Sequence, residues 1–189
     1  MSREIEAKFR LDNLECAETA LKKLNAEFVE NQFQRDYFFY QNQPSGKPAI
    51  YLRLRQQQTD GNQRAFLTYK GSKQDSKFKK RVELELEIDD VETARSLLTA
   101  IGYQQGLSYE KKRQYWKYKH CQVLLDEVPM LGFFVEIEAE DENLISEVQT
   151  DMGLSDYEHI NNGYASMISE KLSASGAKEK QVYFNGQQL

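Results

Sequence analysis

The stretch Glu4-Ile5-Glu6-Ala7-Lys8 places two carboxylates and one ammonium at alternate positions close to the start of the chain. In an extended strand, successive side chains point to opposite faces. Glu4, Glu6 and Lys8 therefore share one face, and Ile5 and Ala7 share the other. A single charged face is common in antiparallel sheets that are wetted on one side. Whether this strand does more depends on whether later strands repeat its pattern.

The alternation does recur in later stretches. Residues 51–57 alternate arginine with leucine, residues 81–89 alternate charged residues with Val, Leu and Ile, and residues 133–140 carry another Glu-x-Glu pair. A period of two with turn residues between the segments is typical of half-buried strands. After the opening strand, we predict strands at residues 33–40, 51–57, 64–70, 81–89, 109–118, 122–127 and 133–140.

Four stretches have helical spacing of apolar residues. We predict a helix that begins at Asp12, a second capped by Asp90 and stopped by Gly102, a third over residues 142–152 and a fourth over residues 164–172. The end of the chain is small and polar apart from Val182-Tyr183-Phe184. We therefore expect one domain over residues 1–172, followed by a loose polar tail over residues 173–189.

The composition excludes several classes of protein. With 189 residues, 40% hydrophobic, 29% charged and a net charge of -5, the chain has the composition of a globular protein and lacks the basic surplus of nucleic-acid binders. It shows no secretory signal and no apolar run of membrane-spanning length, so we expect a cytoplasmic protein that contacts neither nucleic acid nor membrane. Cys16 and Cys121 are too far apart for a CxxC site, and His120 and His159 cannot form a zinc site by themselves.

The charged strand faces contain as many bases as acids. The bases are Lys8, Arg53, Arg55, Lys70, Arg81, Lys111 and Arg113, and the acids are Glu4, Glu6, Glu83, Glu85, Asp126, Glu136 and Glu138. If the strands curl into a barrel with these faces inward, the interior becomes a charged channel, and the helices pack on the apolar faces outside. Mutual pairing of the two signs is the structural alternative, because buried unpaired charges are strongly penalised.

The arrangement of the two signs indicates a ligand. Glu-x-Glu on one strand face suits a hard divalent cation, which prefers carboxylate oxygens. Arg-x-Arg and Lys-x-Arg suit a polyanion, because guanidinium groups bind phosphate oxygens in pairs. Acids for Mg²⁺ or Mn²⁺ beside bases for phosphates describe a site for a metal-bound triphosphate. The chain has no glycine-rich phosphate loop, so side chains must hold the phosphates.

The same residues resemble the motifs of the CYTH superfamily, the triphosphate tunnel metalloenzymes. Glu4-Ile5-Glu6-Ala7-Lys8 matches its ExExK signature. The later landmarks follow in the family's order: Arg53-Leu54-Arg55, Lys70, Arg81-Val82-Glu83-Leu84-Glu85, Lys111-Lys112-Arg113, Asp126, Glu136-Ile137-Glu138 and Tyr164. Residues 125–138 are most similar to the class IV adenylyl cyclases. Met130 departs from that branch, which has a small or polar residue there.

The resemblance implies an α+β fold: a closed antiparallel barrel of eight strands that forms a tunnel with a charged interior, with helices packed on its outside. It also implies a homodimer and dependence on Mg²⁺ or Mn²⁺. Residue by residue, it implies metal ligands at Glu4, Glu6, Asp126, Glu136 and Glu138. It implies triphosphate ligands at Lys8, Arg53, Arg55, Lys70, Arg81, Lys111 and Arg113, and catalytic roles for Lys8, Glu6 and Glu136. Arg81, Glu83 and Glu85 can also serve structural pairing.

The function that this resemblance implies is that of an adenylate cyclase, a lyase that converts ATP to 3′,5′-cyclic AMP and pyrophosphate. One alternative is a triphosphatase that acts on inorganic or thiamine triphosphate, in which Lys8 would orient the attacking water. Another is a protein that binds a nucleotide or polyphosphate without catalysis. The local sequence does not decide which phosphorus atom faces the nucleophile, because all of these can use the same charged lining.

Overall fold

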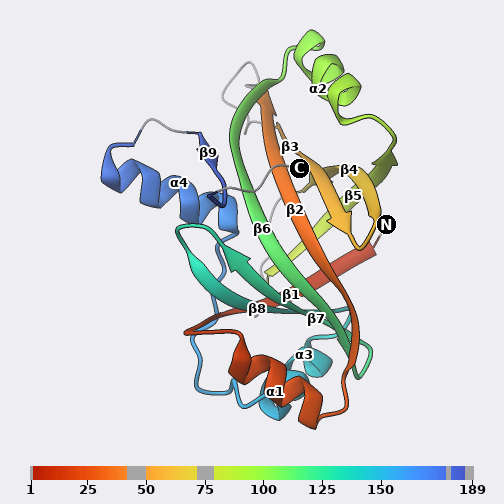
Figure 1. The fold of residues 1–189 in the computed structure, drawn as a ribbon, viewed down its shortest axis with the longest axis vertical. Coiled ribbons are helices and arrows are strands. Elements are labelled where there is room, and N and C mark those ends of the chain that lie inside the picture. Colours follow the sequence, from red (N-terminus) through yellow and green to blue (C-terminus); the bar gives the residue numbers. More distant parts are fainter. Residues whose placement is uncertain (1, 42–49, 72–78, 178–179, 186–189) are drawn as a thin grey trace.

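The computed structural model describes residues 2–41, 50–71, 79–177 and 180–185, with no account of the side chains of residues 2–4, 50 and 79–82 (Figure 1). The described elements are β1 Ser2–Leu11, α1 Glu15–Lys23, β2 Glu27–Gln41, β3 Ile50–Thr59, β4 Asn62–Lys70, β5 Lys79–Ile88, α2 Val91–Ala100, β6 Gln104–Tyr118, β7 Cys121–Val128, β8 Gly132–Ala139, α3 Glu142–Asp151, α4 Tyr164–Ser175 and β9 Gln181–Val182. The predicted strands and four predicted helices are all present, and most strands are longer than predicted.

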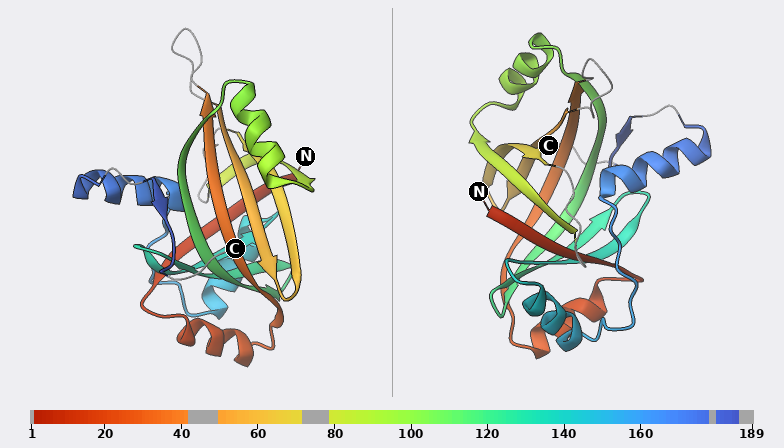
Figure 2. Two further views of the ribbon diagram at one scale, coloured as in Figure 1. Left: turned by 45° about the horizontal axis from the view of Figure 1, so that its top comes forward. Right: turned by 180° about the vertical axis from the view of Figure 1, so that it is seen from behind.

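The strands of the described chain form one nine-stranded sheet in the order β2-β3-β4-β5-β1-β8-β7-β6-β9. The pairs among β1 to β8 are antiparallel. β2 also pairs antiparallel with β6 from Glu27 to Tyr40 (Figures 1 and 2). Each of these eight strands therefore has two neighbours among the eight, and β6 pairs with β9 as a third neighbour. The prediction of an α+β fold with an antiparallel sheet is confirmed.

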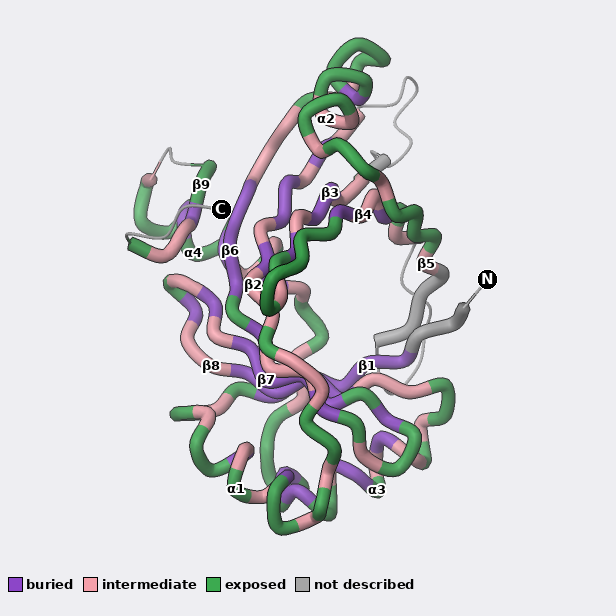
Figure 3. The backbone as a smooth tube through the Cα atoms, turned by 45° about the vertical axis from the view of Figure 1, so that its right-hand side comes forward, coloured by how far each residue is buried: buried purple, intermediate pink, exposed green. Residues whose placement is uncertain are grey.

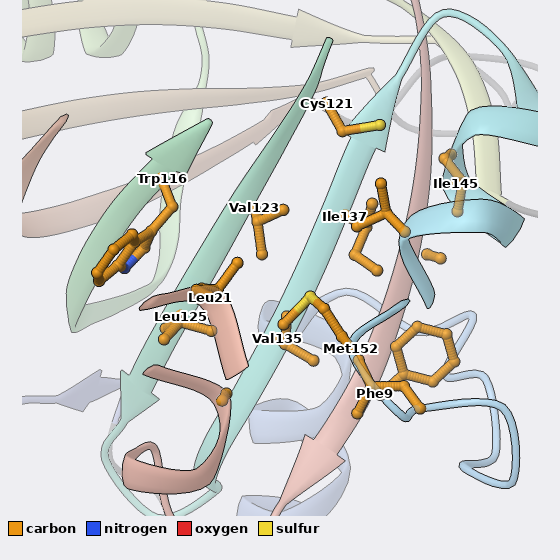
Figure 4. Close-up of a cluster of buried hydrophobic side chains, with 14 of the residues drawn as sticks. Phe9, Leu21, Trp116, Cys121, Val123, Leu125, Val135, Ile137, Ile145 and Met152 are labelled. Atoms are coloured by element: carbon orange, nitrogen blue, oxygen red, sulfur yellow. The ribbon is translucent and has the colours of Figure 1, made fainter. Parts of the chain in front are cut away.

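The largest apolar core lies between one face of β1, β7 and β8 and the helices α1 and α3 (Figure 4). It is built from the apolar members of the alternating strands. These residues are Ile5, Ala7, Phe9, Val123, Leu125, Val135 and Ile137, each at most 3% exposed. Leu21 of α1 and Ile145 of α3 close the core from the other side. Burying one such aliphatic side chain stabilises the fold by about 1.5–3 kcal/mol.

Helices α1 and α2 begin differently. α2 starts as predicted, because the Asp90 side chain accepts hydrogen bonds from the backbone N–H groups of Glu92 and Thr93 at 2.9 and 3.2 Å. α1 starts later than predicted: its N-cap position is Leu14, and Asp12 lies outside the helix. Asn13 instead accepts a 3.4 Å hydrogen bond from the Cys16 N–H. None of the helices in the described ranges is long and apolar enough to cross a membrane.

Helix α4 corrects the expectation that the helices pack only on the outer, apolar face. Its buried residues Tyr164, Ile168 and Leu172 cluster with Phe134 of β8. Phe134 has the opposite orientation to Val135, which faces α1 and α3, and therefore shares a face with Glu136. α4 thus packs against the same strand face that carries the charges, and α1, α2 and α3 pack against apolar clusters on the other face.

The described end of the chain is packed, which corrects the expectation of a loose tail. α4 continues to Ser175, three residues past Leu172. After it, β9 pairs parallel with β6 at Ser108 and Tyr109, and Val182 is 5% exposed. Gln181 and Val182 form this pairing, the Tyr183 hydroxyl lies 2.8 Å from Ser108 Oγ, and the Phe184 N–H donates to Glu110 of β6 at 2.8 Å. How the chain divides into a domain and a tail stays a prediction.

Met130 lies in the turn between β7 and β8, in a backbone conformation that accounts for the small or polar residue of the class IV branch. Met130 has φ of 65°, in the left-handed region, where small or polar residues are favoured over a long side chain. Lys171 of α4 donates a hydrogen bond to its carbonyl oxygen. This contact ties the turn to α4.

Candidate functional site

Lys8 is the centre of the charged cluster. Its side chain is 1% exposed, and its Nζ lies 3.3 Å from Glu6 Oε1 and 3.0 Å from Glu136 Oε1. It also donates to the backbone oxygen of Asn162 at 3.2 Å and lies 4.0 Å from the centre of the Tyr164 ring. Burial by itself lowers the pKa of Lys8, but attraction to Glu136 and Glu6 outweighs it, so the pKa is raised and the ammonium keeps its charge.

The strand pairing brings these groups together. Lys8 of β1 lies opposite Glu136 of β8, and Glu6 lies opposite Glu138 two residues away. Residues directly opposite in an antiparallel pair share a face and lie close enough for their side chains to interact. The ExExK strand and the second Glu-x-Glu strand are therefore adjacent, and their charged residues form one surface.

Asp126 is the second centre, and it is completely buried. Arg113 binds it with two hydrogen bonds of 2.7 and 2.6 Å, and Arg113 also contacts Glu136. Lys111 Nζ lies 3.3 Å from Asp126 Oδ2, and the Tyr164 hydroxyl donates to the same oxygen at 2.9 Å. Burial raises the pKa of Asp126, but Arg113 and Lys111 outweigh it and lower the pKa below its ordinary value.

Two of the groups that contact Asp126, Lys111 and Tyr164, have pKa values shifted in opposite directions. Burial and repulsion from Arg113 lower the pKa of Lys111 to about 7, against the attraction of Asp126. Burial, and then Asp126, raise the pKa of the Tyr164 hydroxyl well above its usual value, so that hydroxyl remains a donor. Lys111 is therefore a buried cation whose charge a bound anion would stabilise.

The third centre includes an acid that the sequence analysis missed. Asp36 of β2 is completely buried and accepts two hydrogen bonds from Arg55, at 2.7 and 2.8 Å. Burial raises the pKa of Asp36, but attraction to Arg55 outweighs it, and the pKa falls well below its usual value. Asp36 lies in an aromatic-rich stretch of sequence, and its register opposite Arg55 is set by the β2–β3 pairing. No local signal identifies such a partner.

Arg53 and Lys70 lie at the more open side of the cluster. Arg53 donates to the Thr68 hydroxyl at 3.1 Å and lies 3.4 Å from Glu85, whose side chain is 48% exposed. The Arg53 Nε is buried and has no hydrogen-bond partner in the described chain. Lys70 contacts Glu83, its opposite residue on β5. Arg53 therefore retains a donor that an anion could use.

The structure brings most of the predicted site residues into contact with one another or with a charged partner. Lys8, Glu6, Glu136, Asp126, Lys111 and Arg113 form one connected network. Arg55 lies in the Asp36 pair, and Arg53 and Lys70 pair with acids of β5. Glu138 is half-buried opposite Glu6. The side chains of Glu4 and Arg81 lie outside the described part, and their backbones are opposite one another on β1 and β5.

The described side chains contain no group of three or more His, Cys, Asp or Glu residues arranged to hold a metal ion. The donor chemistry nevertheless fits a hard divalent cation, because Glu6 and Glu136 both approach Lys8 Nζ from neighbouring strands. In this structure the ammonium of Lys8 is the cation between these two carboxylates. Mutual pairing, the structural alternative, thus operates in the described cluster.

The comparisons with known proteins agree with this geometry. The CYTH domain family matches residues 2–164. A Methanocaldococcus jannaschii protein named "Putative adenylate cyclase" is 33% identical over 136 residues, which are 71% of this chain and 75% of that protein. An Aeromonas hydrophila protein named "Adenylate cyclase CyaB" is 28% identical over 186 residues, 93% of each.

Solved structures show the same fold. A Pyrococcus horikoshii protein has a TM-score of 0.75 at 28% identity and covers 89% of this chain and 99% of its own. A Hippeastrum protein, described as a "putative adenylyl cyclase" with a dominant triphosphatase activity, has a TM-score of 0.62 at 16% identity and covers 95% and 98%. The family match, which extends over most of the chain, shows that this protein belongs to the CYTH family.

Proposed function

We propose that this protein is a metal-dependent enzyme that acts on a triphosphate and converts ATP to 3′,5′-cyclic AMP and pyrophosphate. One observation carries the assignment to a metal-dependent enzyme that acts on a triphosphate: cations from β1, β3 and β6 lie on the same strand faces as Glu6 and Glu136. These cations are Lys8, Arg53, Arg55, Lys111 and Arg113. The names of two relatives favour the cyclase over the triphosphatase. In the reaction the 3′-oxygen forms a bond to the α-phosphorus, the bond from that phosphorus to the bridging oxygen breaks, and the 3′-hydroxyl proton is released.

The buried acids hold the phosphate-binding cations in position. Asp36 fixes the Arg55 guanidinium, and Asp126 fixes Arg113, each by two hydrogen bonds. Donors that are already oriented need little rearrangement when charge develops on the leaving pyrophosphate. Both oxygens of Asp126 are used by Arg113, Lys111 and Tyr164. We therefore assign Asp126 as a positioning residue for the cations, in preference to the direct metal ligand that the resemblance implies.

Lys8 fits a phosphate-binding role better than a role as a base. Its raised pKa keeps the ammonium charged, and a charged ammonium accepts no proton from water or from a hydroxyl. Glu6 and Glu136 are the described carboxylates that would hold Mg²⁺ or Mn²⁺, with Glu4 and Glu138 as further candidates. A divalent cation held there would neutralise phosphate charge and polarise the reacting phosphoryl group.

A closed tunnel is part of the proposal. The β2–β6 pairing, added to the eight-strand order, supports closure of the sheet around the charged face. In Figure 3 buried segments of β1, β3, β6 and β7 border the middle of the molecule, whereas the described part of β5 borders it with exposed residues. The homodimer remains a prediction from the resemblance, and the cytoplasmic location remains a prediction from the sequence.

A triphosphatase is the second candidate. The same cations could hold tripolyphosphate or thiamine triphosphate while water attacks the γ-phosphorus. The adenylate cyclase names of the two relatives favour the cyclase, and the Hippeastrum protein, a match in fold, is described with a dominant triphosphatase activity.

The products distinguish the two reactions. Purified protein is incubated with Mg²⁺ or Mn²⁺ and, in separate reactions, with ATP, tripolyphosphate and thiamine triphosphate, and the products are resolved by chromatography. Cyclic AMP with pyrophosphate supports the cyclase, and orthophosphate supports the triphosphatase. No product from any of the three, under conditions where the protein is folded, contradicts the proposed function.

A further inference from the structure

A row of amide side chains lies beside the charged cluster and has no part in the chemistry described so far. Gln32 Nε2 donates to Glu30 Oε1 at 2.7 Å, and Gln34 Nε2 donates to Gln32 Oε1 at 2.6 Å. Gln34 Nε2 also donates to Gln57 Oε1 of β3 at 2.9 Å. Gln34 is 1% exposed and Gln57 is 9% exposed. We call Gln32, Gln34 and Gln57 the amide row.

Glu30 fixes the direction of this row. An ionised carboxylate only accepts hydrogen bonds, so Gln32 must present its nitrogen to Glu30 and its oxygen to Gln34. Gln34 must in turn present its nitrogen to Gln32 and Gln57. Its Oε1 is left facing away from the row, buried and without a hydrogen-bond partner among the described residues. Rotating the Gln34 amide would not remove the problem, because its oxygen would then face two other oxygens.

The amide row adjoins the cations that the proposed function assigns to phosphate. Gln34 lies opposite Lys111 on β6, and Gln32 lies opposite Arg113. Asp36, which holds Arg55, is two residues further along β2, a distance of about 7 Å in an extended strand. A molecule whose phosphates contact these cations therefore has its next group within reach of the amides.

We propose that the amide row receives the amino-bearing edge of the substrate's nucleobase, so that it selects adenine; this inference rests on the proposed function. An exocyclic amino group is the donor that the buried Gln34 Oε1 lacks. Gln57, whose oxygen is occupied by Gln34, supplies its own nitrogen to an adjacent ring nitrogen. In DNA recognition a single Asn or Gln amide both accepts from and donates to adenine, and here the acceptor and the donor come from two neighbouring amides. A 6-oxo base places an acceptor against the Gln34 oxygen and is rejected.

Calorimetric titration of the full chain tests the proposal, with ATP, inosine triphosphate and tripolyphosphate as three separate ligands in the presence of Mg²⁺. The wild type should bind ATP about tenfold more tightly than inosine triphosphate, the effect of one recovered hydrogen bond. Gln34→Leu should bind ATP and inosine triphosphate with about equal affinity. The substitution should reduce the affinity for ATP more than the affinity for tripolyphosphate. Gln58→Met is the matched control, because Gln58 is the exposed neighbour on the other face of β3.

The outcomes are separable. If the wild type binds ATP and inosine triphosphate equally, or if Gln34→Leu keeps the preference, the amide row does not read the base. If the wild type binds none of the three ligands, the proposed function itself is wrong. Gln34→Leu is checked by thermal melting, and if it does not fold, Gln57→Met, at a less buried position, replaces it. The proposal then requires Gln57→Met to lose the preference for ATP.

Discussion

Lys8 Nζ lies 3.0 Å from Glu136 Oε1, and the two residues are opposite one another on β1 and β8. The ion pair is thus a direct product of strand register. A slip of one residue would move Lys8 to the face that packs on α1 and α3. The apolar alternation that buries Ile5 and Phe9 therefore also fixes the position of the charged groups.

Replacing Lys8 by methionine should destabilise the fold at neutral pH by about 3 kcal/mol, because Glu6 and Glu136 would lose the cation between them. The folded pKa of Lys8 is raised, so its contribution is complete below the unfolded value and is lost as the pH rises through the higher folded value. The difference in unfolding free energy between wild type and Lys8→Met should narrow above about pH 10.

Urea unfolding between pH 7 and pH 11 measures this difference. Lys22→Met is the control, since the Lys22 side chain is 66% exposed. If the difference in unfolding free energy stays constant up to pH 11, the charge of Lys8 does not contribute to stability, and the prediction is contradicted.

Lys111 should couple triphosphate binding to protonation. Its pKa of about 7 leaves much of it neutral at pH 8, and a bound polyanion would favour the charged form. Binding of tripolyphosphate should therefore take up protons at pH 8, and its affinity should fall as the pH rises above 7. Calorimetry in two buffers with different ionisation enthalpies measures the uptake. In Lys111→Met the uptake should disappear, and an unchanged uptake would assign it to another group.

The effect of Lys111 on folding stability should depend on pH, with the largest penalty at low pH. A lysine whose folded pKa is lowered penalises the fold most at low pH, and the penalty declines as the pH rises from about 7 towards the unfolded value. Lys111→Met should accordingly gain most in melting temperature relative to the wild type near pH 6. A gain that is largest near pH 10 has the opposite sign and contradicts this assignment.

Tyr164→Phe should cost about 1 kcal/mol of stability, because it removes the 2.9 Å hydrogen bond to buried Asp126. The ring contacts with Lys8 and Phe134 are kept. Urea unfolding at pH 7 gives the value, and Tyr157→Phe serves as the control because Tyr157 is 45% exposed. Equal effects of the two substitutions would mean that the Asp126 contact contributes nothing.

Arg35→Ala should destabilise the protein more than Arg64→Ala, although Arg35 of β2 and Arg64 of β4 each form an ion pair. Arg35 pairs with Glu110, which is completely buried and otherwise receives the Phe184 N–H at 2.8 Å. Leaving this carboxylate short of a partner costs about 1–3 kcal/mol. Arg64 pairs with Glu87 on the surface, where screening by solvent makes the pair weak. Thermal melting of both variants checks the order, and the reverse order would contradict the packing of the chain end on β6.

The sequence alone is sufficient to predict the strands and most of the cations, because charge and apolarity alternate with a period of two. It does not reveal Asp36, whose role depends on its position opposite Arg55. The contact of Lys8 with the backbone oxygen of Asn162 is not predictable from residue types, because any residue carries that oxygen. Average polarity does not indicate that residues 180–185 pack against β6, because the contacts depend on the three residues Val182, Tyr183 and Phe184.

Helix boundaries show the same limit. Asp90 caps α2 as its sequence predicts, but Asp12 does not cap α1, where the chain leaves β1 and the helix begins only at Glu15. Asp, Asn, Ser and Thr are favoured at helix starts, but such a residue near the start of a helical pattern does not by itself fix the first helical residue.

Metal-dependent binding of tripolyphosphate to the wild type and to Glu6→Gln tests the central claim most directly. The claim is that Glu6 and Glu136 hold a divalent cation beside cations that hold the phosphates. In calorimetric titrations with tripolyphosphate, the wild type should bind it more tightly in the presence of Mn²⁺ than in the presence of EDTA. Glu6→Gln should still bind tripolyphosphate, but Mn²⁺ should no longer strengthen its binding. If the wild type binds no tripolyphosphate, or if Mn²⁺ strengthens binding equally in Glu6→Gln, the claim is contradicted.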